Sequence, residues 1–150
     1  MKKGFIEKEL YDKICAVVPI VCVDIVVVSE KKFLLGKRKN NPAKGQWFFP
    51  GGRMYKNETV ERAAIRKARE EIGLSLKKKD LEILGFGETI FKEGRGVDKN
   101  RHTVNIVFKV ATRSKRFHFD KTQHAQLRWF DSVHPKWNPY VKFFLKKAGF

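Results

Sequence analysis

The chain is poor in cysteine and lacks a long apolar run. Its only cysteines, Cys15 and Cys22, lie in or beside an apolar stretch and form no CxxC pair. This excludes a disulfide framework and a CxxC metal site, and we expect both to be reduced core residues of a cytoplasmic protein. No apolar run is long enough to cross a membrane. The N-terminal segment turns acidic at Glu7 before a signal-peptide core develops.

Acidic residues are scarce relative to basic ones. Thirty-three Lys and Arg stand against 16 Asp and Glu, which gives a net charge of +17. Such an excess can release counterions from nucleic acid, attract a small anion such as a nucleotide, or simply keep the surface solvated. The lysines are scattered along the chain, and no aromatic-rich RNA-binding signature accompanies them. Nucleic acid therefore stays open as a partner but is not favoured over a nucleotide.

The length of 150 residues fits one domain, 1–150, with a core of its own. There are no internal repeats, linkers or low-complexity segments. Apolar periodicity predicts a helix over Phe5–Ile14 and an amphipathic helix over Pro139–Ala148. Between them, a helix rich in alanine is expected to start after Asn57 as N-cap and to end at Gly73.

Runs rich in Val, Ile and aromatic residues predict the strands. A polar loop is expected over Glu93–Arg101. The resulting order, α-β-β-α-β-β-β-α, predicts an α/β/α sandwich of the α+β or α/β class, with a mixed β-sheet between helices. The predicted strands are Val17–Val28, Phe33–Arg38, Leu81–Phe91, Val104–Ala111 and Leu127–Phe130.

The most informative segment is a glycine turn followed by a charged helix. Arg66 and Glu70 are one helical turn apart and share a face, with Glu71 beside it. Two carboxylates next to a glycine turn suit Mg²⁺, or Mn²⁺ in its place, because such ions take oxygen ligands and complete their shell with phosphate and water. An exposed helix with Glu–Arg pairs is the plainer interpretation, but the fixed spacing favours the site. The segment reads Gly52-x5-Glu58-x7-Arg66-Lys67-Ala68-Arg69-Glu70-Glu71-Ile72-Gly73-Leu74.

This spacing resembles the Nudix box, G-x5-E-x7-R-E-U-x-E-E-x-G-U with U aliphatic, a signature of the Nudix hydrolase family. Lys67 stands where the box has Glu, which removes one acid used for metal binding or as a base. The GDP-mannose mannosyl hydrolases also lack that Glu, and the chain resembles them well outside the box. The matching segments lie between Pro19 and Trp129: Pro19–Asp24, Phe33–Arg38, Asn41–Arg53, His102, Gln123-His124 and Arg128-Trp129.

The resemblance to this branch implies a single metal ion. Its ligands would be the Gly51 carbonyl, Glu71 and Gln123, together with the substrate diphosphate. Glu70 would either help to hold the metal or pair with Arg66. The family also implies a homodimer formed through terminal elements, for which Phe5–Ile14 is the candidate segment.

The same resemblance implies the catalytic and substrate-binding residues. Arg38 and Arg53 would contact the diphosphate, as suits the fork of donors on a guanidinium. His124 would be the general base that activates water, since an imidazole titrates near neutrality. Asp24 and His102 would lie at the substrate, although a carboxylate in an apolar strand can also be a satisfied structural acid. Arg66 would support Glu71.

Three functions remain open. The first is a nucleotide-sugar hydrolase of GDP-mannose or GDP-glucose type, in which water attacks the sugar C1 and GDP leaves. The second is a pyrophosphohydrolase that attacks phosphorus in an NTP or another nucleoside diphosphate derivative. The third is a non-catalytic module that binds RNA or a nucleotide. Thr89 and Thr103 replace a His and a Tyr of the mannosyl branch, so the sequence leaves base and sugar undecided.

Overall fold

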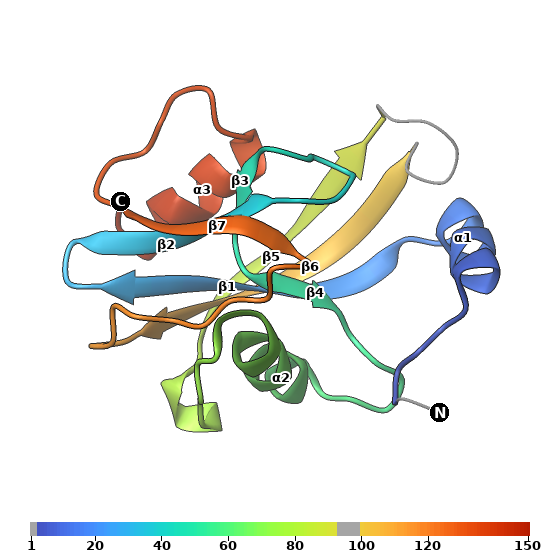
Figure 1. The fold of residues 1–150 in the computed structure, drawn as a ribbon, viewed down its shortest axis with the longest axis horizontal. Coiled ribbons are helices and arrows are strands. Elements are labelled where there is room, and N and C mark those ends of the chain that lie inside the picture. Colours follow the sequence, from blue (N-terminus) through green and yellow to red (C-terminus); the bar gives the residue numbers. More distant parts are fainter. Residues whose placement is uncertain (1–2, 93–99) are drawn as a thin grey trace.

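The computed structural model describes residues 3–92 and 100–150. Three α-helices and seven strands make up its regular structure (Figure 1). The helices are α1 (Lys8–Val17), α2 (Val60–Ile72) and α3 (Pro139–Ala148), and a short 3₁₀ helix spans Lys78–Asp80. The strands are β1 (Ile20–Ser29), β2 (Lys32–Arg38), β3 (Trp47–Phe48), β4 (Gly51–Arg53), β5 (Glu82–Phe91), β6 (Arg101–Ala111) and β7 (His124–Phe130).

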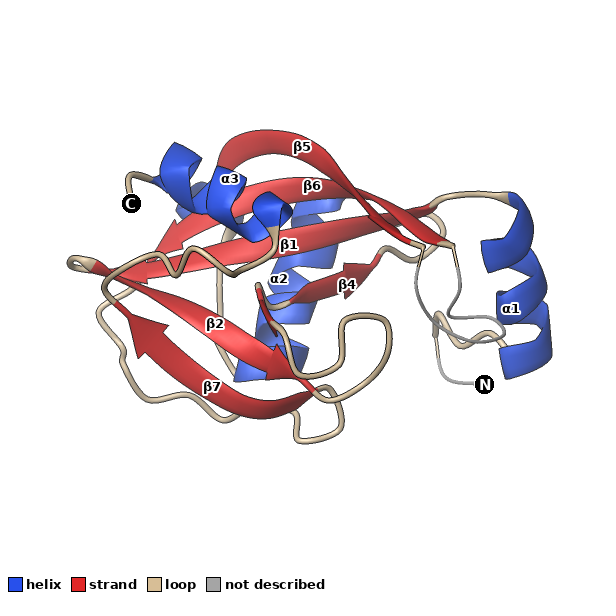
Figure 2. Ribbon diagram, turned by 90° about the horizontal axis from the view of Figure 1, so that it is seen from above, coloured by secondary structure: helices blue, strands red, loops and turns tan. Residues whose placement is uncertain are grey.

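One mixed sheet organises the molecule. Its order is β3-β2-β1-β6-β5, with β4 paired to β1 and β7 paired to β2. The β1 and β6 strands run parallel, whereas the other pairs are antiparallel. Helix α2 covers one face and α3 the other, while α1 stands apart at one end (Figure 2). The predicted sandwich with a mixed sheet is confirmed.

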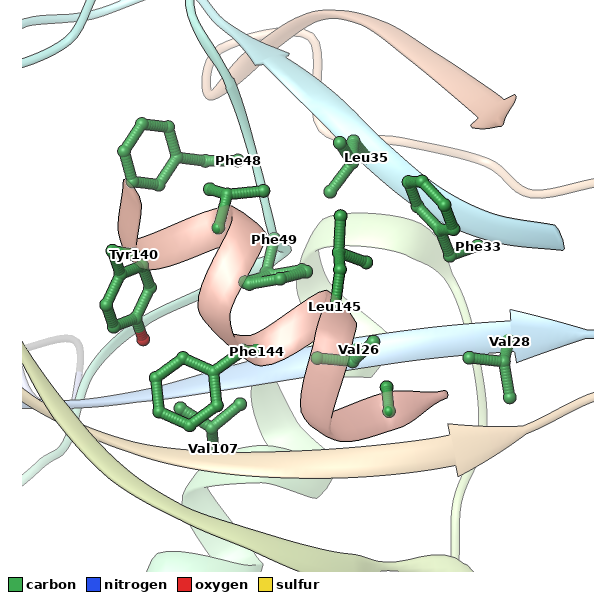
Figure 3. Packing of buried hydrophobic residues seen from close by; sticks show 12 residues of the cluster. Val26, Val28, Phe33, Leu35, Phe48, Phe49, Val107, Tyr140, Phe144 and Leu145 are labelled. Carbon is green, nitrogen blue, oxygen red and sulfur yellow. The ribbon is translucent and has the colours of Figure 1, made fainter. Parts of the chain in front are cut away.

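The alternation of side chains along β1 divides the core into two layers. Val23, Ile25 and Val27 pack against α2, whose buried face consists largely of alanines. Val26 and Val28 point to the opposite face, where they meet α3 and the aromatic residues of β2 and β3 (Figure 3). Asp24 belongs to this second face, so its carboxylate lies on the side of the sheet that α3 covers.

Two helix boundaries differ from the sequence prediction. Helix α1 spans Lys8–Val17 rather than Phe5–Ile14, and none of its residues is buried. Its periodicity therefore marks no core face. Thr59, not Asn57, is the N-cap of α2, and its side chain accepts a hydrogen bond from Arg62 N. Asn57 has a positive φ of 64° in the preceding turn, a conformation that asparagine tolerates better than most residues.

The strands also begin at different residues than predicted. β1 starts at Ile20, because Val17 ends α1, and β6 starts at Arg101. β7 starts at His124 rather than at Leu127, which places His124 in the sheet instead of a loop. The short strands β3 and β4 were not predicted. Of the loop expected over 93–101, residues 93–99 lie outside the described residues. In the described part of the chain, no helix has the length and apolar character needed to span a bilayer.

Candidate active site

A cleft of about 540 Å³ opens at the α3 side of β1, beside the glycine turn. Most of the residues singled out in the sequence line it: Asp24, Arg38, Gly51, Arg53, Glu71, Gln123 and His124. Three do not. His102 lies outside the lining, 3.9 Å from Glu88, and Arg66 and Glu70 line a separate hollow on α2. The fold therefore gathers residues from β1, β2, β4, α2 and β7 around one space.

Glu71 is the centre of the polar contacts in this cleft. Its Oε1 lies 2.7 Å from Lys67 Nζ, and its Oε2 lies 2.8 Å from His124 Nε2. The backbone N–H of Gly51 also donates to Oε2, at 3.2 Å. Burial alone would raise the pKa of Glu71, but the hydrogen bond with His124 and the charge of Lys67 outweigh it and lower the pKa. Glu71 is therefore an ionised carboxylate held from three sides.

His124 is buried, with 4% of its surface exposed. Because an ionised carboxylate only accepts hydrogen bonds, Nε2 carries the proton in its contact with Glu71. Nδ1 makes no hydrogen bond to the described residues. Gly36 on β2 makes room for the ring, since a Cβ at that position would collide with Nδ1. The imidazole is therefore held in place with Nε2 hydrogen-bonded to Glu71 and with Nδ1 free of hydrogen bonds to the described residues.

Asp24 forms a second polar centre on the floor of the cleft. Its Oδ2 accepts a hydrogen bond from the Tyr140 hydroxyl at 2.5 Å. Burial raises the pKa of Asp24 to about 7, against the opposing effect of the Tyr140 hydrogen bond. Gly51 must be a glycine here, because a Cβ would collide with Asp24 Oδ1 and the Val23 carbonyl. Asp24 therefore lies directly against the glycine turn.

Two arginines line the cleft on either side of these carboxylates. Arg38 is half-buried and donates through Nε to the Pro42 carbonyl at 2.8 Å. Its burial lowers the pKa of the guanidinium, which Asp24 and Glu71 partly offset. Arg53 donates to the Gly4 carbonyl at 2.6 Å and lies over the rings of Tyr11 and Tyr55.

Sequence reasoning missed several residues that line or adjoin this space. Tyr11 comes from α1 and Tyr140 from α3, and no local pattern connects either with the glycine turn. Asn105 on β6 is 3% exposed, and its Nδ2 has no hydrogen-bond partner among the described residues. Lys67 was singled out as a departure from the box, but its contact with Glu71 was not predicted, although it precedes Glu71 by four residues on one helix.

Arg66 has a different environment from the cleft residues. Its Nε lies 2.7 Å from Glu58 Oε1 and its Nη2 lies 2.9 Å from Glu58 Oε2, so the two residues form a bidentate ion pair. Arg66 also bonds Glu70 at 3.1 Å and the Arg53 carbonyl at 3.0 Å. The guanidinium thereby fastens the turn before α2 to the helix. Glu70 pairs with Arg66 and also lies 3.7 Å from Lys67 Nζ, but it does not line the cleft.

These residues do not fit a divalent ion held by the protein alone. Among the described residues, no group of three or more His, Cys, Asp or Glu could hold a metal ion. Both oxygens of Glu71 are engaged by Lys67 and His124, and Glu70 pairs with Arg66. Gln123 and the Gly51 turn adjoin this set but add only neutral oxygens. A Mg²⁺ ion at this place would need most of its ligands from elsewhere.

Comparison with known proteins relates this arrangement to a family. The model of the NUDIX domain matches residues 18–140. The low-salt glycan biosynthesis protein Agl8 of Haloferax volcanii is 38% identical over 140 residues, covering 90% of this chain and 85% of that protein. The ADP-ribose pyrophosphatase of Methanocaldococcus jannaschii is 43% identical over 90 residues, 60% of this chain and 49% of that protein. A MutT NUDIX hydrolase structure from Burkholderia pseudomallei has a TM-score of 0.74 and 27% identity, covering 87% of this chain and 98% of that chain.

Proposed function

This chain belongs to the NUDIX domain family, and from this premise we propose that it hydrolyses a nucleoside diphosphate sugar, of GDP-mannose or GDP-glucose type. The proposal rests on one observation above all. The cleft places cationic side chains, among them Arg38, Arg53 and Lys67, near a buried Glu71–His124 pair. Cationic side chains can bind a diphosphate, and an imidazole held by a carboxylate can activate a water molecule. The similarity to a glycan biosynthesis protein agrees with a sugar nucleotide as substrate.

In the proposed reaction, the diphosphate lies against Arg38 and Arg53 as GDP departs. The guanidinium groups stabilise the negative charge that develops on the leaving phosphate. His124 is the general base of this proposal, and Glu71 positions its imidazole through Nε2. Asp24 and Nδ2 of Asn105, which has no hydrogen-bond partner among the described residues, would offer hydrogen bonds to sugar hydroxyls. NUDIX hydrolases generally use a divalent ion such as Mg²⁺, and here substrate phosphate oxygens would supply most of its ligands.

Hydrolysis of GDP-mannose in oxygen-18 water tests this proposal. We expect the label in the sugar, because water attacks C1. The His124→Gln variant should lower kcat about a hundredfold or more, as for a lost general base, whereas His134→Gln, at an exposed histidine, should have wild-type activity. Label in a phosphate would refute attack at carbon.

A second candidate is a pyrophosphohydrolase that attacks phosphorus. The partial similarity to an ADP-ribose pyrophosphatase and the retained Glu70 and Glu71 favour it. Adding ADP-ribose and NTPs to the same assay distinguishes the two by where the label appears. Absence of turnover on the whole panel, combined with salt-dependent RNA binding, would indicate a binding module instead.

A further inference from the structure

Lys67 is the residue at which this chain departs most clearly from the box of its family. It stands on α2, one helical turn before Glu71, and its side chain is only 15% exposed. Its Nζ lies 2.7 Å from Glu71 Oε1 and 3.7 Å from Glu70 Oε2. The substitution of Lys for Glu therefore changes the charge at this position by two units and places a cation directly on the acid of the box.

The fold makes room for this cation. Gly52 lies beside the lysine stem, and a Cβ there would come within 2.9 Å of Lys67 Cε and 3.2 Å of Nζ. A lysine in solution would keep its ammonium group hydrated, but here the stem runs over the glycine turn and the ammonium lines the cleft. Lys67 is the only lysine or arginine at ion-pair distance from Glu71 among the described residues, and the side chain of Glu71 is 5% exposed.

We propose that Lys67 is a tethered cation that takes the place of a protein-held divalent ion at Glu71 and contacts the diphosphate of the substrate. An ammonium occupies the Glu71 oxygen that a metal would otherwise bind, and a bound metal and Nζ at this spot would repel each other. From the same position, Nζ faces the cleft beside Gly52 and can donate to phosphate as well as to Glu71. The diphosphate part rests on the proposed function, whereas the effect on metal binding does not.

Metal binding to the free protein is the first test. Titration of Mn²⁺ into the enzyme without substrate, followed by calorimetry, should give at least tenfold weaker binding for the wild type than for Lys67→Glu. Lys31→Glu, in the exposed turn between β1 and β2, makes the same charge change far along β1 from the cleft and should bind as the wild type does. Equal Mn²⁺ affinity of the wild type and Lys67→Glu would overturn the proposal.

Binding of inorganic pyrophosphate in EDTA is the second test. Lys67→Met keeps the aliphatic stem over Gly52 and removes only the ammonium, so it is expected to fold even if Lys67→Glu does not. It should weaken pyrophosphate binding about tenfold, while Lys31→Met should leave it unchanged. Equal affinity of wild type and Lys67→Met would also overturn the proposal. Neither test requires turnover, so inactivity toward sugar nucleotides would retire the proposed function and leave the effect of Lys67 on metal binding intact.

Discussion

Replacement of Arg66 by methionine should destabilise the protein far more than removal of an exposed ion pair. Methionine keeps most of the aliphatic volume, but the two bonds to Glu58 and the bond to the Arg53 carbonyl are lost. The side chains of Arg66 and Glu58 are 18% and 10% exposed, so the carboxylate is left poorly solvated. Breaking a largely buried pair costs about 3 kcal/mol, which in a chain of this size lowers Tm by about 6–12 °C.

A double-mutant cycle isolates the pair itself. Arg66→Met, Glu58→Gln and the double variant, compared by urea unfolding, should give a coupling energy of about 2 kcal/mol. Lys13 and Glu9 on α1 provide the matched control. Their ion pair has the same 2.7 Å distance, but their side chains are 71% and 83% exposed. Lys13→Met and Glu9→Gln should therefore couple by no more than about 0.5 kcal/mol.

The pH dependence of the coupling follows from the pKa of Glu58. The hydrogen bond from Arg66 lowers it below the ordinary value of 4.5. A lowered folded-state pKa means that the contribution is complete above the unfolded-state pKa and disappears as the pH falls through the folded-state value. Coupling at pH 7 as small as in the exposed control, or coupling that does not weaken as the pH is lowered below 4.5, would refute the assignment of Arg66 as the residue that holds the turn.

Three further results are expected. The pKa of Asp24 is raised from 3.8 to about 7, so between these values the folded protein holds a proton that the unfolded chain has lost. The stability of the wild type should therefore fall by about 3 kcal/mol more than that of Asp24→Asn as the pH rises from 5 to 8. Urea midpoints that change in parallel for the two proteins would contradict this. Gly36→Ala should displace the His124 ring, seen as a shifted imidazole NMR signal and activity no higher than that of His124→Gln. Phe144→Ala, at a residue 1% exposed, should cost about 3–5 kcal/mol, whereas the neighbouring Phe143→Ala, 53% exposed, should cost under about 1 kcal/mol in the same unfolding assay.

The local signals in the sequence were sufficient for the family and the sandwich. Gly73 ends α2 in a left-handed conformation as predicted, and Val141, Phe144 and Leu145 of α3 are buried as their spacing indicated. Membership of the Nudix family is confirmed, while the GDP-mannose branch remains a prediction, as do the roles assigned to the site residues. The periodicity of Phe5–Ile14 predicted a helix, which the structure has at Lys8–Val17, and the role of this segment in a homodimer stays a prediction.

What only the tertiary structure decided is how the charged residues are distributed. Spacing along one helix predicted that Arg66, Glu70 and Glu71 lie together, but Glu71 lines the cleft, whereas Arg66 binds Glu58 and the turn before α2 and pairs with Glu70 outside the cleft. The contacts of Glu71 with His124, and of Asp24 with Tyr140, join residues 53 and 116 positions apart. Sequence patterns determine local periodicity and turns, because those depend on near neighbours. Which polar groups share a buried space depends on strand register and on the helices that close over the sheet, and these are fixed only when the whole chain packs.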